Sequence, residues 1–251
     1  MLDRRLCGGN GWRQINCAPH PPVLQVTSMS FIEWITRRPG FRSLEDSFAI
    51  NRESMFAGLQ RAIAKQQGTC DEVWLVAHFF DTFVALQNFL AVAEIDYEIV
   101  DQPVHGISLA RHRDGRPGKV RLSLATLIED RAEEGTGAKA VSDAGRVSMA
   151  IIVCERHPHH VQDKHLLDAA KQIEASVTFG YVLSLDDVVV KQIVSPTVLL
   201  VLEQLGLDER EMIASHYLSR LLERRLIKQG QRYTGDQEAE SAARWIELNS
   251  R

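Results

Sequence analysis

The sequence predicts an α/β protein in which a five-stranded, mostly parallel sheet is flanked by helices. The first observation is a continuous β-branched and aromatic run, VWLVAH at 73–78, which suits a strand buried on both faces. A stripe of apolar residues from Phe83 to Leu90 follows and predicts a helix, for which Asp81 or Thr82 can provide the N-cap. A second short strand is predicted at 97–100, and strand, helix, strand is the unit of a parallel sheet.

Further elements continue this alternation along the chain. Apolar residues at helical spacing predict a helix over 52–67, ahead of the first strand. A long loop separates the third predicted strand from the fourth, and a helix over 162–175 leads into the fifth. The three remaining strands are predicted at 119–126, 146–155 and 178–185. Asp186 and Asp187, after the last of them, are expected to serve as the N-cap and first-turn charges of a helix.

We expect three regions in the chain. Residues 1–45 are rich in Gly, Pro and Arg and are predicted to form an irregular or partly disordered extension. Residues 46–187 contain the α/β domain. Residues 188–251 are predicted to form a C-terminal helical segment that packs on this domain, with helices over 188–204, 208–228 and 236–248.

Composition excludes some classes of function. The 251 residues carry a net charge of −4, which gives no electrostatic case for nucleic-acid binding. No apolar stretch approaches the roughly 20 residues needed to span a bilayer, and the N-terminus has no apolar core of a secretory signal. The four cysteines show no CxxC spacing, so we expect reduced thiols in a cytoplasmic protein.

Motifs for nucleotide or nucleophile chemistry are absent from the sequence. It contains no Walker A loop, no strand-linked GxGxxG and no GxSxG elbow. The glycines of EEGTGAK precede Lys139 in the manner of a phosphate loop. However, Glu133 and Glu134 stand just before them and would repel a phosphate.

Four histidines stand close together and raise the question of a metal site: His157, His159, His160 and His165. Zinc requires three or four ligands that converge on one point. His160 and His165 are five residues apart, whereas residues four apart would align on a helix. We therefore expect a solvated loop between a strand and a helix, and we keep a metal site formed by these histidines as an alternative.

The same stretch resembles the second motor domain of SecA, the ATPase that drives preproteins through the bacterial translocon. In that family one strand ends in TERH and a later one in YLSLED. Here residues 155–157 (ERH) and 184–187 (SLDD) stand at the same separation. Segments at 73–102, 119–126 and 202–225 are also similar to family segments and occur in the family order. The resemblance implies a RecA-like, helicase C-terminal-like domain of the P-loop NTPase type.

The departures from the SecA pattern concern the residues that act on ATP. In the family, arginines of a helix reach the phosphates as arginine fingers, which stabilise the charge on the transferred phosphoryl group. The corresponding residues here are Leu167, Ala169 and Gln172. Arg131 falls on an arginine of the second nucleotide motif, but Asp130 and Ala132 replace its flanking glycines.

The resemblance and its departures together imply a catalytically degenerate motor domain, a pseudo-ATPase. It would act as a non-enzymatic binding or regulatory module for a protein partner, namely a SecA-like motor half or a translocon component, with no cofactor. One alternative is half of a split SecA-like ATPase that completes an ATP or ADP site in trans. The vestigial nucleotide contacts would then be Arg131, Arg156 and Lys171. The second alternative is a metal-binding protein that uses the histidine cluster.

Overall fold

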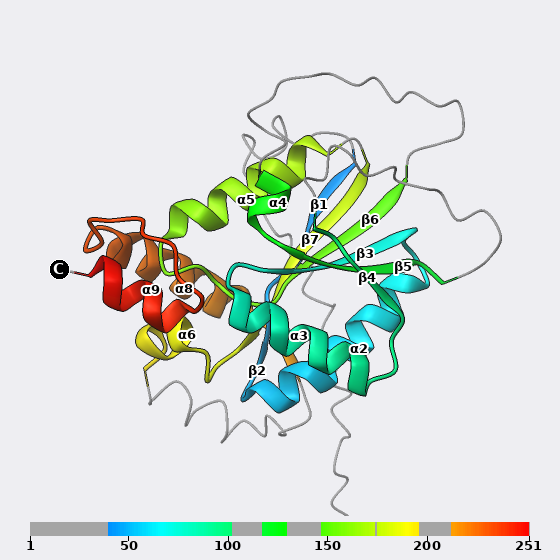
Figure 1. Ribbon diagram of the computed structural model, residues 1–251, viewed down its shortest axis with the longest axis horizontal. Helices are drawn as coiled ribbons and strands as arrows, with labels where there is room; N and C mark the ends of the chain where they lie inside the picture. Colours follow the sequence, from blue (N-terminus) through cyan, green and yellow to red (C-terminus); the bar gives the residue numbers. More distant parts are fainter. Residues whose placement is uncertain (1–39, 102–116, 130–146, 174, 196–211, 251) are drawn as a thin grey trace, which may run out of the picture. The chain divides into compact units, whose positions relative to one another are not determined.

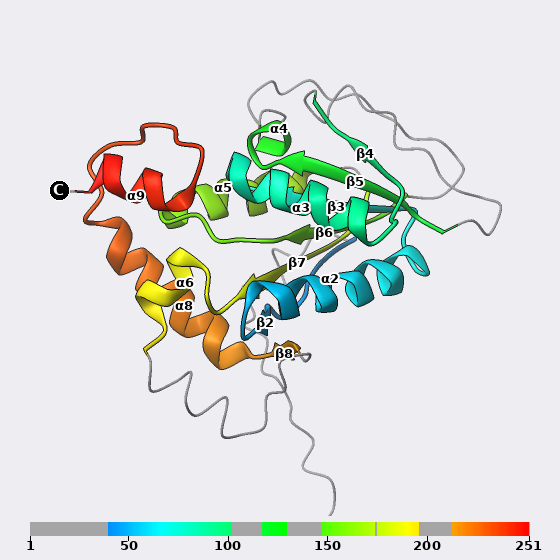
Figure 2. The ribbon, with the colours of Figure 1, turned by 60° about the horizontal axis from the view of Figure 1, so that its bottom comes forward.

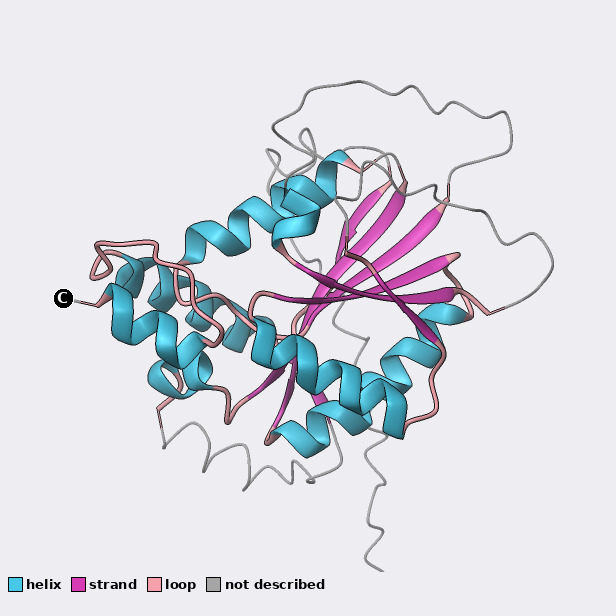
Figure 3. Cartoon of the chain, viewed as in Figure 1, coloured by secondary structure: helices cyan, strands magenta, loops and turns pink. Residues whose placement is uncertain are grey.

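Helices on both faces of a mostly parallel sheet make up the computed structural model, and this arrangement confirms the predicted α/β class (Figures 1 and 3). The structure describes residues 40–101, 117–129, 147–173, 175–195 and 212–250. The chain divides into the units Met1–Arg37 and Arg38–Arg251, and every described residue belongs to the second.

The sheet follows the order β4-β5-β3-β6-β7-β2-β8, and β1 also pairs with β7. All of these pairings are parallel except that of β8 with β2. The strands are β1 (Phe41–Ser43), β2 (Ser47–Ala49), β3 (Glu72–Ala77), β4 (Tyr97–Ile99), β5 (Lys119–Leu124), β6 (Ser148–Val153), β7 (Ser176–Ser184) and β8 (Met212–Ala214).

The side chains of the strands alternate between two hydrophobic cores. Leu75 of β3 faces a core that includes helices α2 and α3, whereas Trp74 of the same strand faces the core on the α5 side. Both side chains are almost fully buried, as expected for strands covered on two faces. The helices are α2 (Arg52–Gln67), α3 (Phe80–Val92), α4 (Thr126–Glu129), α5 (His160–Gln172), α6 (Val188–Ile193), α8 (His216–Gly230) and α9 (Ala242–Asn249).

The connections diverge between β3 and β6, which lie side by side. After β3 the chain passes through α3 to β4 on one side of the sheet. After β6 it passes through α5 to β7 on the other side. In open α/β sheets, ligands bind at such a switch point, outside the carboxyl ends of the strands. Helices α6, α8 and α9 gather at this end of the sheet (Figures 1 and 2).

The five predicted strands are confirmed, but the sheet in the described residues has three more. Strand β1 lies within the stretch that we expected to be irregular, and β2 follows it directly. Both strands pair with β7 and thus extend the sheet beyond that strand. The two short segments carry no periodic pattern that would indicate their pairing with β7.

The predicted helix over 208–228 is wrong in its first part. Residues 212–214 form β8, which pairs with the free edge of β2, and Ser215 then caps α8 by accepting a hydrogen bond from the backbone of Leu218 at 3.3 Å. The predicted helix over 236–248 likewise begins later, where Ser241 caps α9. Helix α6 ends at Ile193, and residues 196–204 of its predicted span lie outside the described residues.

The predicted cap at Asp187 is confirmed, because its carboxylate accepts a hydrogen bond from the backbone of Val189 at 2.9 Å.

Candidate functional site

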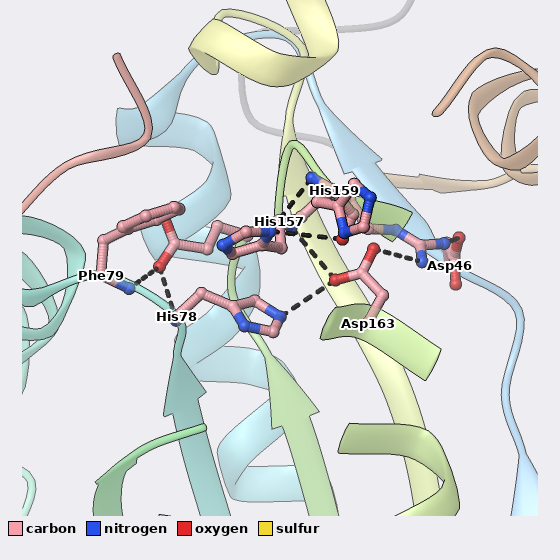
Figure 4. A network of polar contacts seen from close by, with 8 residues as sticks. Asp46, His78, Phe79, His157, His159 and Asp163 are labelled. Carbon is pink, nitrogen blue, oxygen red and sulfur yellow. Dashed lines mark hydrogen bonds and ion pairs between the residues drawn. The ribbon is translucent and has the colours of Figure 1, made fainter. Parts of the chain in front are cut away.

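A cluster of buried polar side chains lies at the carboxyl ends of β3 and β6, at the switch point of the sheet (Figure 4). His78 follows β3 directly, and Glu155, Arg156 and His157 follow β6. Asp163 projects from the first turn of α5, and Asp46 comes from the segment between β1 and β2. In an α/β protein this is the position at which a ligand would bind.

The side chain of Glu155 contacts the start of α3. Its Oε1 accepts hydrogen bonds from the backbone N–H groups of His78 at 2.7 Å and Phe79 at 2.9 Å. Its Oε2 accepts one from the hydroxyl of Thr82 at 2.8 Å. The carboxylate, from the loop after β6, therefore caps the start of α3. The predicted N-cap at Asp81 or Thr82 is wrong, because Phe79 holds that position. Burial raises the pKa of Glu155 to about 7, although these donors and His78 act in the opposite direction.

Arg156 is held between two buried carboxylates. Its Nη2 lies 2.7 Å from Asp46 Oδ2, and its Nη1 lies 3.3 Å from Asp163 Oδ2. The guanidinium also lies over the ring of Tyr181, 3.6 Å from the ring centroid. Both terminal nitrogens of Arg156 are thus engaged within the protein, and its side chain is only 11% exposed.

Asp46 lies in a bulge between β1 and β2, and this bulge brings its side chain to Arg156. Ser43 is opposite Phe179 and Ser47 is opposite Val182, so residues 44–46 face only residues 180–181 of β7. The extra residue of a bulge changes the direction in which a side chain points, here that of Asp46. Bulges are common beside functional sites.

Asp163 links the two sides of the cluster. Its Oδ1 lies 3.0 Å from Nε2 of His78 and also accepts a hydrogen bond from the backbone of His157 at 3.1 Å. Burial acts to raise the pKa of Asp163, but the contacts with His78 and Arg156 outweigh it, and the pKa is lowered.

His157 packs as an aromatic residue. Its ring stacks on Phe79 with the centroids 5.1 Å apart and meets Trp245 of α9 edge-on at 4.8 Å. Its Nδ1 accepts a hydrogen bond from the backbone N–H of His159 at 3.0 Å. Burial is the main cause that lowers the pKa of His157 to about 3, so the ring is neutral at physiological pH.

The other three histidines of the 157–165 stretch lie in different surroundings. The ring of His159 contacts Trp245 and His160, and burial lowers its pKa. His160 Nδ1 is buried without a hydrogen-bond partner in the described part of the chain, and it lies close to Gly230 at the end of α8. His165 is exposed on α5. Across the described ranges, no group of three or more His, Cys, Asp or Glu side chains is arranged to hold a metal ion.

Two of the predicted nucleotide contacts, Arg156 and Lys171, have different partners in the structure. Arg156 belongs to the buried cluster, whereas Lys171 lies on the outer part of α5 and pairs with Asp168 at 2.9 Å. Arg131 lies outside the described residues. Leu167 and Ala169, at two of the arginine-finger positions, pack on or within the hydrophobic core.

Helix α9 covers the cluster. Trp245 is 2% exposed and contacts His157, His159 and Tyr233. The preceding segment is attached to the start of α3, because the backbone N–H of Asp81 donates to the carbonyl of Glu240 at 3.0 Å. The switch point is therefore filled by side chains of the protein itself, with each carboxylate of Asp46, Glu155 and Asp163 engaged by donors or cations.

Sequence reasoning found the ERH stretch but missed most of its partners, namely Asp46, His78, Asp163, Tyr181 and Trp245. Asp46 and Arg156 are 110 residues apart, and a bulge in a short strand has no sequence signature that would connect them. His78, directly after a buried strand, was the one signal that could have been followed, since strand ends carry functional side chains in α/β folds.

No protein-family model matches the sequence. No curated protein matches it either. Among solved structures, the chain is similar to the C-terminal part of the Fun30 ATPase domain, with 14% sequence identity and a TM-score of 0.35. The match covers 72% of this chain and 56% of that one, so this chain spans little more than half of that structure. A likeness at this level defines no function. Searched over its described residues, the chain has no helix of the length and apolarity needed to cross a membrane.

Replacement of Arg156 tests its structural part in the cluster. Arg156→Met leaves the carboxylates of Asp46 and Asp163 buried beside an uncharged side chain, and we expect a loss of about 3–5 kcal/mol in the free energy of unfolding. Lys171→Met is the matched control, because its pair with Asp168 is exposed and contributes at most about 1 kcal/mol. Urea unfolding of both variants measures the difference, and equal losses would contradict the assignment.

The raised pKa of Glu155 predicts how stability depends on pH. Between its ordinary value of 4.5 and the folded value of about 7, the folded chain holds a proton that the unfolded chain has released. Ionisation of Glu155 therefore removes stability as pH rises through this window, with a slope of at most about 1.4 kcal/mol per pH unit. His157 acts in the opposite direction, so only a comparison with a variant isolates Glu155.

We expect Glu155→Gln to gain stability relative to the wild type as pH rises from 5 to 7, because glutamine does not ionise. Urea unfolding at intervals of pH gives this difference. Exposed Glu247→Gln on α9 serves as the control. A constant offset between Glu155→Gln and the wild type over this range would show that Glu155 does not titrate there.

Proposed function

We propose that this chain is a non-enzymatic binding or regulatory module with a RecA-like fold, a degenerate form of the second motor domain of SecA. Its partner would be a protein, such as a SecA-like motor half or a translocon component, and it would need no nucleotide. The SecA relationship rests on the ERH and SLDD residues and their spacing. A fold does not by itself imply a function, so the proposal depends on the site.

One observation carries the proposal: the switch point is occupied by the chain's own side chains. A ligand at the ends of β3 and β6 would have to displace Trp245 and compete with the ion pairs of Arg156. Breaking a buried ion pair is costly, because it leaves an uncompensated charge. This supports a domain whose surfaces, and not its switch point, make contact with other molecules.

The residues of α5 support the same conclusion. In a motor domain, cations on this helix would reach phosphates across a cleft. Here Ala169 is 3% exposed and faces the core, and Lys171 is paired with Asp168 on the same helix. No strand-linked phosphate loop exists in the sequence to bind a nucleotide in their place.

Calorimetric titration of the purified chain with ATP and ADP in the presence of magnesium tests this proposal. We expect no binding heat up to nucleotide concentrations of about 1 mM, which corresponds to a binding free energy weaker than about −4 kcal/mol. A dissociation constant in the low micromolar range, about −8 kcal/mol, would contradict it and favour a half-motor that completes its site in trans. Arg156→Met serves as a control, since heat that survives this substitution comes from elsewhere on the protein.

A further inference from the structure

Helix α8 presents an outward face on which cations and apolar residues alternate. Its buried stripe consists of Leu218, Leu222, Leu226 and Gly230, at intervals of four residues, and packs towards α5 and α6. The opposite side of the helix carries Tyr217, Arg220, Arg224, Ile227 and Lys228, all of which are exposed. Tyr217 is 70% exposed and Ile227 is 43% exposed.

The charge of α8 differs from that of the rest of the protein. The helix contains four Arg and Lys residues and a single Glu, although the chain as a whole has a net charge of −4. Within the residues that the structure describes, none of Arg220, Arg224 and Lys228 forms an ion pair. By comparison, Lys164, Lys171 and Arg244 all pair with acidic residues on their own helices.

Local helix energetics do not account for this pattern. Cations favour the last turn of a helix, and only Lys228 occupies that turn. Arg220 and Arg224 are four residues apart, as are Arg224 and Lys228, and like charges at this spacing destabilise a helix by about 0.2–0.5 kcal/mol per pair. A negatively charged partner on this face would remove the repulsion.

We propose that the face of α8 formed by Tyr217, Arg220, Arg224, Ile227 and Lys228 binds an acidic amphipathic helix of a partner protein. This inference rests on the proposed function, for which it supplies the partner's chemistry. Cations four residues apart are about 6 Å apart along the helix axis, which equals the spacing of Glu residues at i and i+4 on a facing helix. Tyr217 and Ile227 provide apolar contacts between the charges, as in helix-to-helix recognition.

The same observations argue against a nucleic acid as the ligand. Proteins that bind single strands combine a basic groove with several aromatic side chains on which bases stack. The face of α8 has one aromatic ring, that of Tyr217, and the isoleucine beside the cations offers nothing to a phosphate. The sequence pI of about 6.1 is also far from the strongly basic values typical of nucleic-acid-binding domains.

Fluorescence anisotropy with the full chain tests the proposal. The probe is a labelled synthetic helical peptide of about 20 residues, with Glu at i and i+4 and Leu between them. We expect a dissociation constant of about 1–10 μM at physiological salt. The variant R220E/R224E/K228E should weaken binding at least tenfold, because it turns attraction into repulsion. The variant Y217S/I227S, which keeps the charge, should also weaken it several-fold.

Controls make each outcome decisive. R42E/K65E reverses two exposed cations elsewhere and should leave peptide binding unchanged. Circular dichroism establishes that each variant is folded, and R220Q/R224Q/K228Q replaces the reversal variant if the latter unfolds. Failure of the peptide to bind, or equal binding by the reversal variant, would overturn the proposal. Binding of oligothymidylate in place of the peptide would overturn it in favour of a nucleic acid. Nucleotide calorimetry remains independent, so failure of the proposed function is recognised separately.

Discussion

The guanidinium of Arg156 lies between the carboxylates of Asp46 and Asp163 and against the ring of Tyr181. Four segments meet at this point: the bulge before β2, the loop after β6, the first turn of α5 and strand β7. Burying two carboxylates is unfavourable unless a cation compensates them, so Arg156 stabilises the packing of these segments against one another. The position of α5, and with it the position of His157, depends on this interaction.

The arrangement converts an ordinary ligand-binding position into part of the core. In α/β proteins, the residues that follow the two strands at the switch point usually face a ligand. In this chain these strands are β3 and β6. Here Glu155 caps α3, Arg156 pairs with Asp46 and Asp163, and His157 packs between Phe79 and Trp245. Helix α9 then covers them, whereas the outer faces of the described helices remain exposed. Among these, the face of α8 combines exposed apolar residues with cations that form no ion pair within the described residues.

The sequence was informative where a pattern is local. The central strands could be predicted because a strand buried on both faces is a continuous apolar run, as at 73–78. The cap at Asp187 could be predicted for the same reason, since a cap and its helix are neighbours in sequence. Strands β1, β2 and β8 could not, because their pairing depends on the edges of β7 and β2, which no local pattern indicates.

The candidate site was predictable only in its centre. The ERH stretch stood out, but the part played by each of its residues depends on partners that are distant in the sequence. Glu155 acts on backbone groups 76 and 77 residues away, and Arg156 acts on Asp46 across 110 residues. The resemblance to SecA made Arg156 a candidate nucleotide contact for a half-motor, whereas the contacts of Arg156 in the structure are internal ion pairs.

Hydrogen–deuterium exchange of the full chain, with and without an excess of magnesium-ATP, tests most directly whether the switch point is closed. If the side chains of Arg156, His157 and Trp245 fill it, amide exchange over residues 77–82 and 154–163 should be the same in both samples. Slower exchange in these two segments on addition of ATP would place a nucleotide at the carboxyl ends of β3 and β6, and it would contradict a switch point closed by the protein's own side chains.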